Sequence, residues 1–345
     1  MRQKRGKIGQ SMQQLKKQKI VVIAFNDCLT SSLLGILDVL EMCNQFWKME
    51  NPNNETIFQT EVVSVDGEIK HSFNAFPINP TKSMEKVTNA DIIIIPPIMH
   101  KITAVLAENQ LLIPWLIKMH TKGALIASVC TGAFFLAQTG LLNGKRATTN
   151  PMIADTFRSK YPKIDLDLDH IVVIENQLIT SGPTYAFIDL VVFIIEKYVS
   201  AELALTVSKL LLHDKNRNAL SSYLLPSLKM AENDEEILKI QKWIKVNAFD
   251  RGINLDNLAN RFHMSSRNLT RRFQKATGIT PLHYLQTLRV EKAKALLEKT
   301  QKSLEEVTHT VGYADSKSFA RLFKKQINLS PSEYRKRFSS RVAVV

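Results

Sequence analysis

The sequence is poor in cysteine and has no long apolar run. Only three of its 345 residues are cysteines, and Cys28, Cys43 and Cys130 have the spacing of neither a disulfide framework nor a metal site. Chains of this kind are typical of a reducing compartment, so we expect a cytoplasmic protein. No stretch approaches the roughly 18 uninterrupted apolar residues of a membrane helix, so we expect no membrane association.

Acidic residues are missing from the first 19 positions, which carry seven lysines and arginines. Basic charge is again in excess in residues 231–345, whose net charge is +10, whereas residues 20–230 have a net charge of −3. A basic segment attached to a mildly acidic body is typical of a protein that binds nucleic acid. We interpret residues 1–18 as a flexible basic tail that can add contacts to DNA phosphates.

The last third of the chain contains an internal repeat. Six apolar or proline positions recur at an offset of 49 residues at first and 50 residues later. The first copy has Leu255, Leu258, Leu269, Phe273, Pro281 and Tyr284 where the second has Leu304, Val307, Phe319, Phe323, Pro331 and Tyr334. In each copy the spacing predicts a short helix, a polar break and a second helix, which is the pattern of a helix-turn-helix motif.

Each second helix of the repeat is expected to present basic and polar side chains to DNA. Ser265 or Ser266 can cap the first of these helices and Asp315 or Ser316 the other, while a long helix from Pro281 would hold the motifs at a fixed separation. Such side chains reach phosphates and base edges from a helix in the major groove. The candidate DNA-binding residues are Arg267, Asn268, Thr270, Arg271, Lys275, Ser316, Lys317, Arg321, Lys324, Arg335 and Lys336. The alternative is a solvated helical bundle, which the basic charge of this segment disfavours.

Residues 235–338 resemble the AraC/XylS-type DNA-binding domain. The resemblance rests on Val311-Gly312-Tyr313, Ser318-Phe319, Arg321-Leu322-Phe323-Lys324 and Leu329-Ser330-Pro331-Ser332-Glu333-Tyr334-Arg335. Thr308 and Asn328 depart from the usual Ala and Gly, and Asn tolerates a left-handed backbone better than most residues. The resemblance implies double-stranded DNA as a partner and leaves a contact with RNA polymerase open.

Residues 19–212 alternate between strand-like and helix-like segments. Residues 20–25, 91–95 and 124–128 are apolar runs typical of buried strands, whereas residues 31–49 and 111–120 have helical spacing. This alternation predicts an α/β fold, in which helices cover both faces of a parallel sheet. Folds of this kind bind ligands at the carboxyl ends of their strands.

Residues 165–170 place three aspartates and a histidine in the run Asp-Leu-Asp-Leu-Asp-His. Strict alternation with leucine favours an edge strand with carboxylates facing solvent over a metal site. We therefore expect neither a metal nor a cofactor.

A strand-to-helix turn is expected at Cys130. The run Ser128-Val129-Cys130-Thr131-Gly132-Ala133 has the small residues that let a sharp turn expose one side chain, as in a nucleophile elbow. The N–H groups after such a turn and the start of the following helix can favour a thiolate.

The residues around this turn resemble the ThiJ/PfpI-like half of GlxA-type transcriptional regulators. Besides the turn, the matching residues are Gly140-Leu141-Leu142-Asn143-Gly144-Lys145-Arg146-Ala147-Thr148-Thr149, Thr180-Ser181-Gly182 and Asp189. Proteins of this type join a flavodoxin-like domain, related to class I glutamine amidotransferases, to an AraC-type domain in this order. The resemblance spans residues 19–338.

Three parts of a hydrolytic site are absent by comparison with catalytic members of that superfamily. Asn150 stands where they have a histidine, and an amide cannot act as a base near neutral pH. Ser32 falls near the position of an acidic residue, and Pro96-Pro97 replaces a glycine-rich stretch that lends N–H groups. We therefore expect a binding pocket without enzyme activity.

The predicted ligand pocket consists of Ser32, Pro96, Pro97, Cys130, Thr131, Asn150 and Ser181. Relatives of this type sense nitrogen-containing metabolites such as amino acids or quaternary amines, and a cation would need aromatic or acidic walls. Three alternatives stay open. They are an amidase, protease or glyoxalase-like enzyme with a DNA-binding appendage, a redox sensor working through Cys130, and an empty relic that serves dimerisation.

Residues 213–233 change in character and are interpreted as a linker between domains. The predicted organisation is a basic tail (1–18), a ligand-sensing and dimerisation domain (19–212), the linker (213–233) and a double helix-turn-helix domain (234–339). We expect a homodimer.

Overall fold

The computed structural model describes residues 16–213, 230–231 and 234–339, and the chain divides into two compact units between Asn218 and Ala219. Most of the predicted basic tail (1–18) and of the predicted linker (213–233) lies outside the described residues. Within these ranges, no helix is long and apolar enough to cross a membrane.

A seven-stranded sheet forms the centre of the first unit, with strand order β10-β11-β7-β6-β1-β2-β5. Neighbouring strands are parallel except β10, which runs antiparallel to β11. The strands are β1 (Gln18–Ile23), β2 (Phe58–Ser64), β5 (Lys82–Ser83), β6 (Ile92–Ile95), β7 (Leu125–Val129), β10 (Val172–Glu175) and β11 (Leu178–Ser181). The order β2-β1-β6-β7-β11 is that of flavodoxin-like folds, which confirms the predicted fold class.

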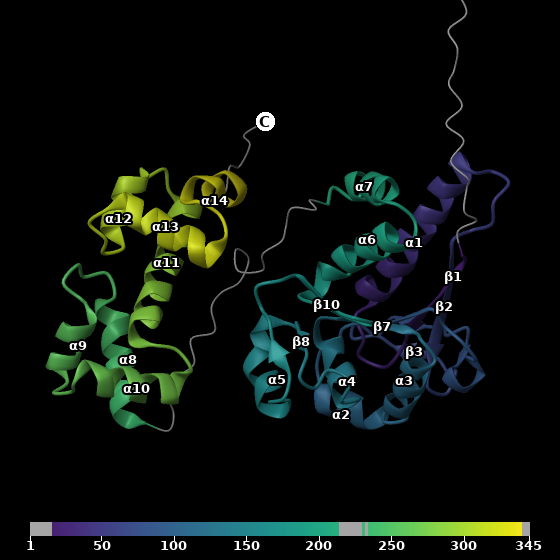
Figure 1. Cartoon of the computed structure of the whole chain (residues 1–345), viewed down its shortest axis with the longest axis horizontal. Coiled ribbons are helices and arrows are strands. Elements are labelled where there is room, and N and C mark those ends of the chain that lie inside the picture. The colour runs from purple at the N-terminus through teal and green to yellow at the C-terminus, as the bar shows by residue number, and fades with distance from the viewer. Residues whose placement is uncertain (1–15, 214–229, 232–233, 340–345) are drawn as a thin grey trace, which may run out of the picture. The chain divides into compact units, whose positions relative to one another are not determined.

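Helices cover both faces of this sheet (Figure 1). On one face are α1 (Thr30–Glu50), α6 (Phe187–Tyr198) and α7 (Ala201–Leu210), and on the other are α2 (Ile102–Glu108), α3 (Leu112–Thr121) and α4 (Ala133–Gln138). Every residue of β6 and β7 is buried. Strands enclosed on both sides need continuous apolar runs, which explains why residues 91–95 and 124–128 read as buried strands.

The predicted edge strand at residues 165–170 is wrong beyond Leu166. Strand β9 (Asp165–Leu166) pairs only with β8 (Arg146–Ala147). Helix α5 (Ala154–Lys160) lies between these two strands in the sequence. Asp167 does not face solvent: its side chain is 13% exposed and accepts hydrogen bonds from the N–H groups of Asp169 and His170. Its carboxylate stabilises a turn, and the described residues contain no group of three potential metal ligands.

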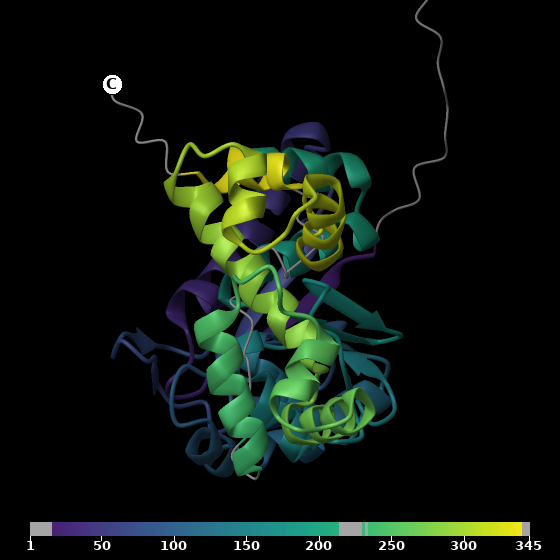
Figure 2. The same cartoon turned by 90° about the vertical axis from the view of Figure 1, so that its left-hand side faces the viewer.

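The described residues of the second unit form seven helices. They are α8 (Glu235–Asn247), α9 (Leu255–Arg261), α10 (Ser266–Thr277), α11 (Pro281–Lys299), α12 (Leu304–Thr310), α13 (Ser316–Ile327) and α14 (Pro331–Phe338). Helix α11 begins at the predicted proline and runs from the half that contains α8 to α10 into the half that contains α12 to α14 (Figure 2). The buried apolar residues form a separate cluster in each half, around Phe273 and Tyr284 in one and Phe323 and Tyr334 in the other. Repeated sequence has thus produced a repeated core.

Candidate ligand pocket and nucleic-acid interface

The turn after β7 has the backbone geometry expected of an elbow. Cys130 has φ of +55°, a conformation that costs energy for a residue with a side chain and is retained mainly at functional sites. Gly132 follows because the backbone after β6 passes close by. A Cβ on Gly132 would lie 2.6 Å from the carbonyl oxygen of Ile95 and 2.7 Å from that of Pro96. Only glycine fits between the elbow and this segment.

Thr131 ties the elbow to the segment after β6. Its hydroxyl donates to the carbonyl of Ile98 at 2.6 Å and accepts from the N–H of Ile98 at 2.7 Å. The N–H of Leu29, just before α1, donates to the carbonyl of Pro97 at 3.1 Å. The structure therefore brings the start of α1, the buried Pro96-Pro97 pair and the elbow together at the carboxyl edge of the sheet.

Three polar side chains lie beside the sulfur of Cys130, and each of them acts to lower the pKa of the thiol. They belong to Thr184, Thr131 and Asn150. Thr184 was not among the predicted residues. It follows β11, whose carboxyl end pairs with that of β7, and this adjacency was not visible in the sequence.

The other predicted pocket residues have different surroundings. Ser181 directs its hydroxyl to the carbonyl of Ser128 at 3.1 Å, so it bonds to the backbone of β7. Ser32 lies in the first turn of α1 and is fully buried, and its hydroxyl has no hydrogen-bond partner among the described residues. A buried hydroxyl without a partner costs free energy, and Ser128 and Thr148 of this unit have the same property.

The thiol of Cys130 is neither exposed nor acidic, which corrects the expectation drawn from the sequence. Its residue is 2% exposed. Burial raises the pKa of Cys130, and the hydrogen bonds from the backbone and from Thr184 only partly oppose this. Desolvation disfavours the thiolate, so the start of the following helix does not activate the sulfur.

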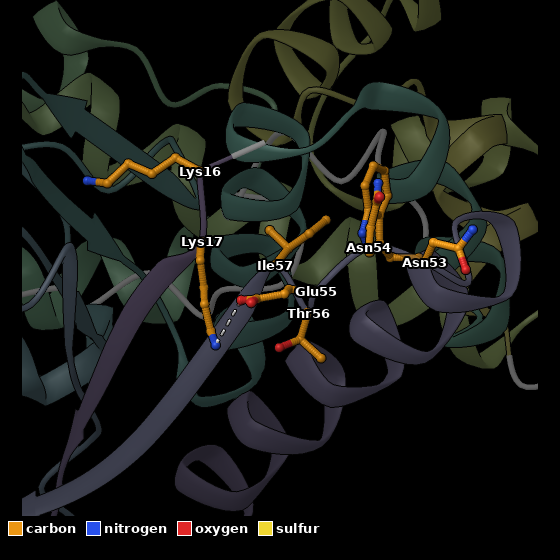
Figure 3. Close-up of a pocket in the computed structure, with 8 residues that line it drawn as sticks. Lys16, Lys17, Asn53, Asn54, Glu55, Thr56 and Ile57 are labelled. Atoms are coloured by element: carbon orange, nitrogen blue, oxygen red, sulfur yellow. Dashed lines mark ion pairs between the residues drawn. The ribbon is translucent and has the colours of Figure 1, made fainter. Parts of the chain in front are cut away.

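A separate pocket of about 570 Å³ lies at the amino ends of β1 and β2, beside the end of α1 (Figure 3). It is lined by Lys16, Lys17, Trp47, Asn53, Asn54, Glu55, Thr56 and Ile57. Lys17 and Glu55 form an ion pair across it at 3.6 Å. This pocket contains none of the predicted residues, which lie at the opposite, carboxyl edge of the sheet.

Both helix-turn-helix motifs form as predicted. Ser265, not Ser266, caps α10 by accepting from the N–H of Asn268, and Asp315, not Ser316, caps α13 by accepting from the N–H groups of Lys317 and Ser318. The two recognition helices α10 and α13 end in left-handed residues, at Gly278 and Asn328. Asn328 has φ of +59°, so the asparagine does replace the glycine of the first copy.

Most of the predicted DNA-binding side chains are exposed. The exposed residues are Arg267, Arg271, Lys275, Lys317, Arg321, Lys324 and Lys336, and the half-buried ones are Asn268, Thr270, Ser316 and Arg335. Thr270 donates to the carbonyl of Ser266 in its own helix. Arg335 donates to the carbonyl of Lys302, so part of its guanidinium serves the packing of α14.

Arg272 shows why neighbouring arginines in α10 differ. Its guanidinium binds the carboxylates of Asp234 and Glu236 at 2.7 Å and 2.6 Å, whereas the guanidinium of Arg271 donates a hydrogen bond to the side chain of Asn268 in its own helix. The hydrogen bond from Arg272 lowers the pKa of Asp234, which also caps α8. Asp234 and Glu236 therefore hold the start of α8 against α10.

Comparison with known proteins gives the same two parts in the same order. Residues 18–197 match the DJ-1/PfpI family, and residues 258–337 match a helix-turn-helix domain. The HTH-type transcriptional regulator GbdR of Pseudomonas aeruginosa is 23% identical over 319 residues, which cover 92% of this chain and 84% of GbdR. The HTH-type transcriptional regulator CdhR of the same species is 25% identical over 305 residues, which cover 88% of each chain.

A solved structure of a ThiJ/PfpI family protein from Pseudomonas syringae superposes with a TM-score of 0.50 at 15% identity, covering 71% of this chain and 93% of that one. At this identity the likeness concerns the fold alone. The chain belongs to the DJ-1/PfpI family. Its second unit is an AraC-type helix-turn-helix domain, so the whole is a DNA-binding transcription regulator.

Proposed function

We propose that the DJ-1/PfpI domain of this regulator binds a small effector at the Cys130 elbow and thereby changes how the helix-turn-helix domain binds DNA. The observation that carries the proposal is the set of polar side chains around Cys130 at the carboxyl edge of the sheet. Thr131, Asn150 and Thr184 surround the sulfur of Cys130, and the Ser32 hydroxyl is buried without a partner among the described residues. An effector that hydrogen-bonds these groups would offset the cost of their burial.

The proposal includes the absence of catalysis. Asn150 lies beside the sulfur and is not a general base, and burial raises the pKa of Cys130. A protonated thiol without a base is a poor nucleophile, which argues against an amidase, a protease or a glyoxalase. The same burial argues against a redox sensor, because oxidation favours exposed thiolates.

We expect no turnover of amide, peptide or 2-oxoaldehyde substrates by the purified full-length chain beyond that of a Cys130→Ala variant. Iodoacetamide should also alkylate Cys130 more slowly than free cysteine at pH 8, because the raised pKa keeps the sulfur protonated. Mass spectrometry of the modified peptides measures this rate. Turnover that disappears in Cys130→Ala would replace the sensor by an enzyme.

The effector class that we propose is a nitrogen-containing metabolite, with amino acids and quaternary amines as the compounds to test. An effector present at about 100 times its dissociation constant should stabilise the protein by roughly 2.7 kcal/mol, which a thermal melt detects. Asn150→Leu should abolish this shift. Asn54→Leu is the matched control, because Asn54 lines the separate pocket at the amino edge of the sheet.

If the effector-induced rise in melting temperature is lost in Asn54→Leu and kept in Asn150→Leu, the effector binds in the separate pocket and not at Cys130. If no compound of the panel shifts the melting temperature of the full-length chain, the effector does not belong to the proposed class.

The proposed organisation of the regulator follows the sequence. Residues 19–212 sense the effector and dimerise, residues 213–233 link the units, and residues 234–339 bind DNA. We propose a cytoplasmic homodimer, and the exposed surface of the second unit leaves room for a contact with RNA polymerase.

A further inference from the structure

Helix α11 carries a buried arginine at the point where it passes from one apolar cluster of the DNA-binding domain to the other. Tyr284 and Leu285 pack in the first cluster, and Val290 and Ala293 pack in the second. Arg289 lies between them and is 5% exposed. Burying a cation is costly unless its N–H groups find acceptors, so the contacts of Arg289 are informative.

The donors of Arg289 bind the loop that follows α8 in the first half of the domain. Nε donates to the carbonyl of Ala248 at 2.7 Å, and Nη2 donates to the carbonyl of Asp250 at 2.7 Å. Carbonyls at the end of a helix lack helical partners and favour a cation. Arg289 therefore fixes α11 to the end of α8.

The same guanidinium reaches the second half of the domain. Its central carbon lies 5.0 Å from the centre of the Tyr313 ring, which belongs to the turn between α12 and α13. An arginine over an aromatic face is attracted by the ring. One side chain thus contacts the loop that precedes the first helix-turn-helix motif and the turn of the second motif.

Gly312 allows this close approach. It has φ of +85°, and a Cβ at this position would lie 2.8 Å from the carbonyl oxygen of Phe249 and 3.1 Å from Nη2 of Arg289. A larger residue would push the turn of the second motif away from the α8 loop. The loop, Arg289 and the Gly312-Tyr313 turn therefore form one packed contact.

We propose that Arg289 is a positioning residue that sets the separation of the recognition helices α10 and α13, and hence the one spacing of DNA half-sites that the domain accepts. The proposal rests on DNA binding by both motifs and is independent of the effector. Moving a half-site by one base pair shifts it by about 3.4 Å along the duplex and rotates it by about 35°. A rigid pair of motifs cannot follow such a change, whereas a loosened pair can.

The spacing of the half-sites provides the first test, with the full-length chain and a duplex that the wild type selects from randomised DNA. One base pair is inserted or removed between the half-site that α10 contacts and the half-site that α13 of the same domain contacts. The wild type should lose about 10- to 100-fold in affinity, which is the range expected when one of two linked contacts is broken. Arg289→Met should bind the selected duplex within about tenfold of the wild type and lose less than about threefold on the altered spacings.

Matched variants separate the effect of the Arg289 contacts from general effects of charge. Lys299→Met removes an exposed cation from the end of the same helix and should keep the spacing penalty of the wild type. Arg289→Lys keeps the charge but loses the fork that holds two carbonyls, so its penalty should fall as well. A wild-type spacing penalty in Arg289→Met would overturn the proposal.

A second measurement needs no DNA. It therefore tests whether Arg289 fixes the separation of α10 and α13 even if the domain does not bind DNA as proposed. Spin labels at Gln274→Cys and Lys325→Cys report the distance between the two recognition helices, because both positions are exposed and the three native cysteines are buried. The wild type should give a narrow distance distribution, and Arg289→Met a broad one. If Arg289→Met does not fold, Gly312→Ala and Tyr313→Leu test the same contact from the other side. Narrow distance distributions in the folded variants would show that the Arg289 contacts do not fix the separation of α10 and α13.

Discussion

Replacing Arg271 or Arg321 by alanine is expected to weaken DNA binding by about 1 to 3 kcal/mol each, or roughly 5- to 150-fold. Both side chains are exposed on recognition helices, Arg271 on α10 and Arg321 on α13. Each loss should concern the base pairs of its own half of the site, because the two motifs contact different halves. Titration of duplexes substituted at single base pairs measures both the affinity and the base preference.

The neighbouring Arg272 provides the control for this prediction. Its guanidinium binds Asp234 and Glu236, so Arg272→Ala should lower the melting temperature while leaving the base preference unchanged. If Arg271→Ala leaves both affinity and base preference at wild-type values, α10 is not the helix that contacts bases in the first motif.

Separating the two units is expected to have the largest effect on DNA affinity. A fragment of residues 230–345 should bind the same duplex about 10²- to 10⁴-fold more weakly than the full-length chain, because a dimer supplies a second DNA-binding domain at high local concentration. It should also ignore any effector that shifts the full-length protein. Each unit has its own buried core, which makes both fragments suitable for this experiment.

The complementary fragment of residues 19–212 should be a dimer that does not bind DNA, as measured by light scattering after size exclusion. Fusing the DNA-binding fragment to an unrelated dimeric coiled coil should restore much of the lost affinity. A monomeric fragment of residues 19–212, or a DNA-binding fragment with full affinity, would contradict the dimer.

The sequence was most informative where it repeats itself or stays apolar. Residues 91–95 and 124–128 predicted strands β6 and β7 because a buried strand needs an unbroken apolar run. The repeat predicted α10 and α13 but left two candidate caps for each helix, because a cap at Ser265 and a cap at Ser266 look alike until the backbone is known. The alternation of aspartate and leucine at residues 165–170 wrongly predicted a strand, because the Asp167 carboxylate stabilises a turn by accepting hydrogen bonds from backbone N–H groups.

The surroundings of functional side chains were harder to predict, since they depend on elements distant in the sequence. The motif at Cys130 predicted the elbow, but its exposure and acidity depend on how the segments after β6 and β11 close over the sulfur. Thr184 lies 54 positions away from the cysteine that it contacts, and no local pattern connects the two. Arg289 looks like one more basic residue of a DNA-binding domain until its acceptors at Ala248 and Asp250 are seen.

The division of the DNA-binding domain into two apolar clusters also has a consequence for how it unfolds. Helix α11 contributes Tyr284 to one cluster and Val290 to the other, so loss of either half leaves part of this helix without its packing partners. Because Arg289 joins the halves by polar contacts, each half can open without exposing the core of its neighbour. Amide hydrogen exchange should then show two cooperative units, with the shared helix protected by whichever unit is the more stable.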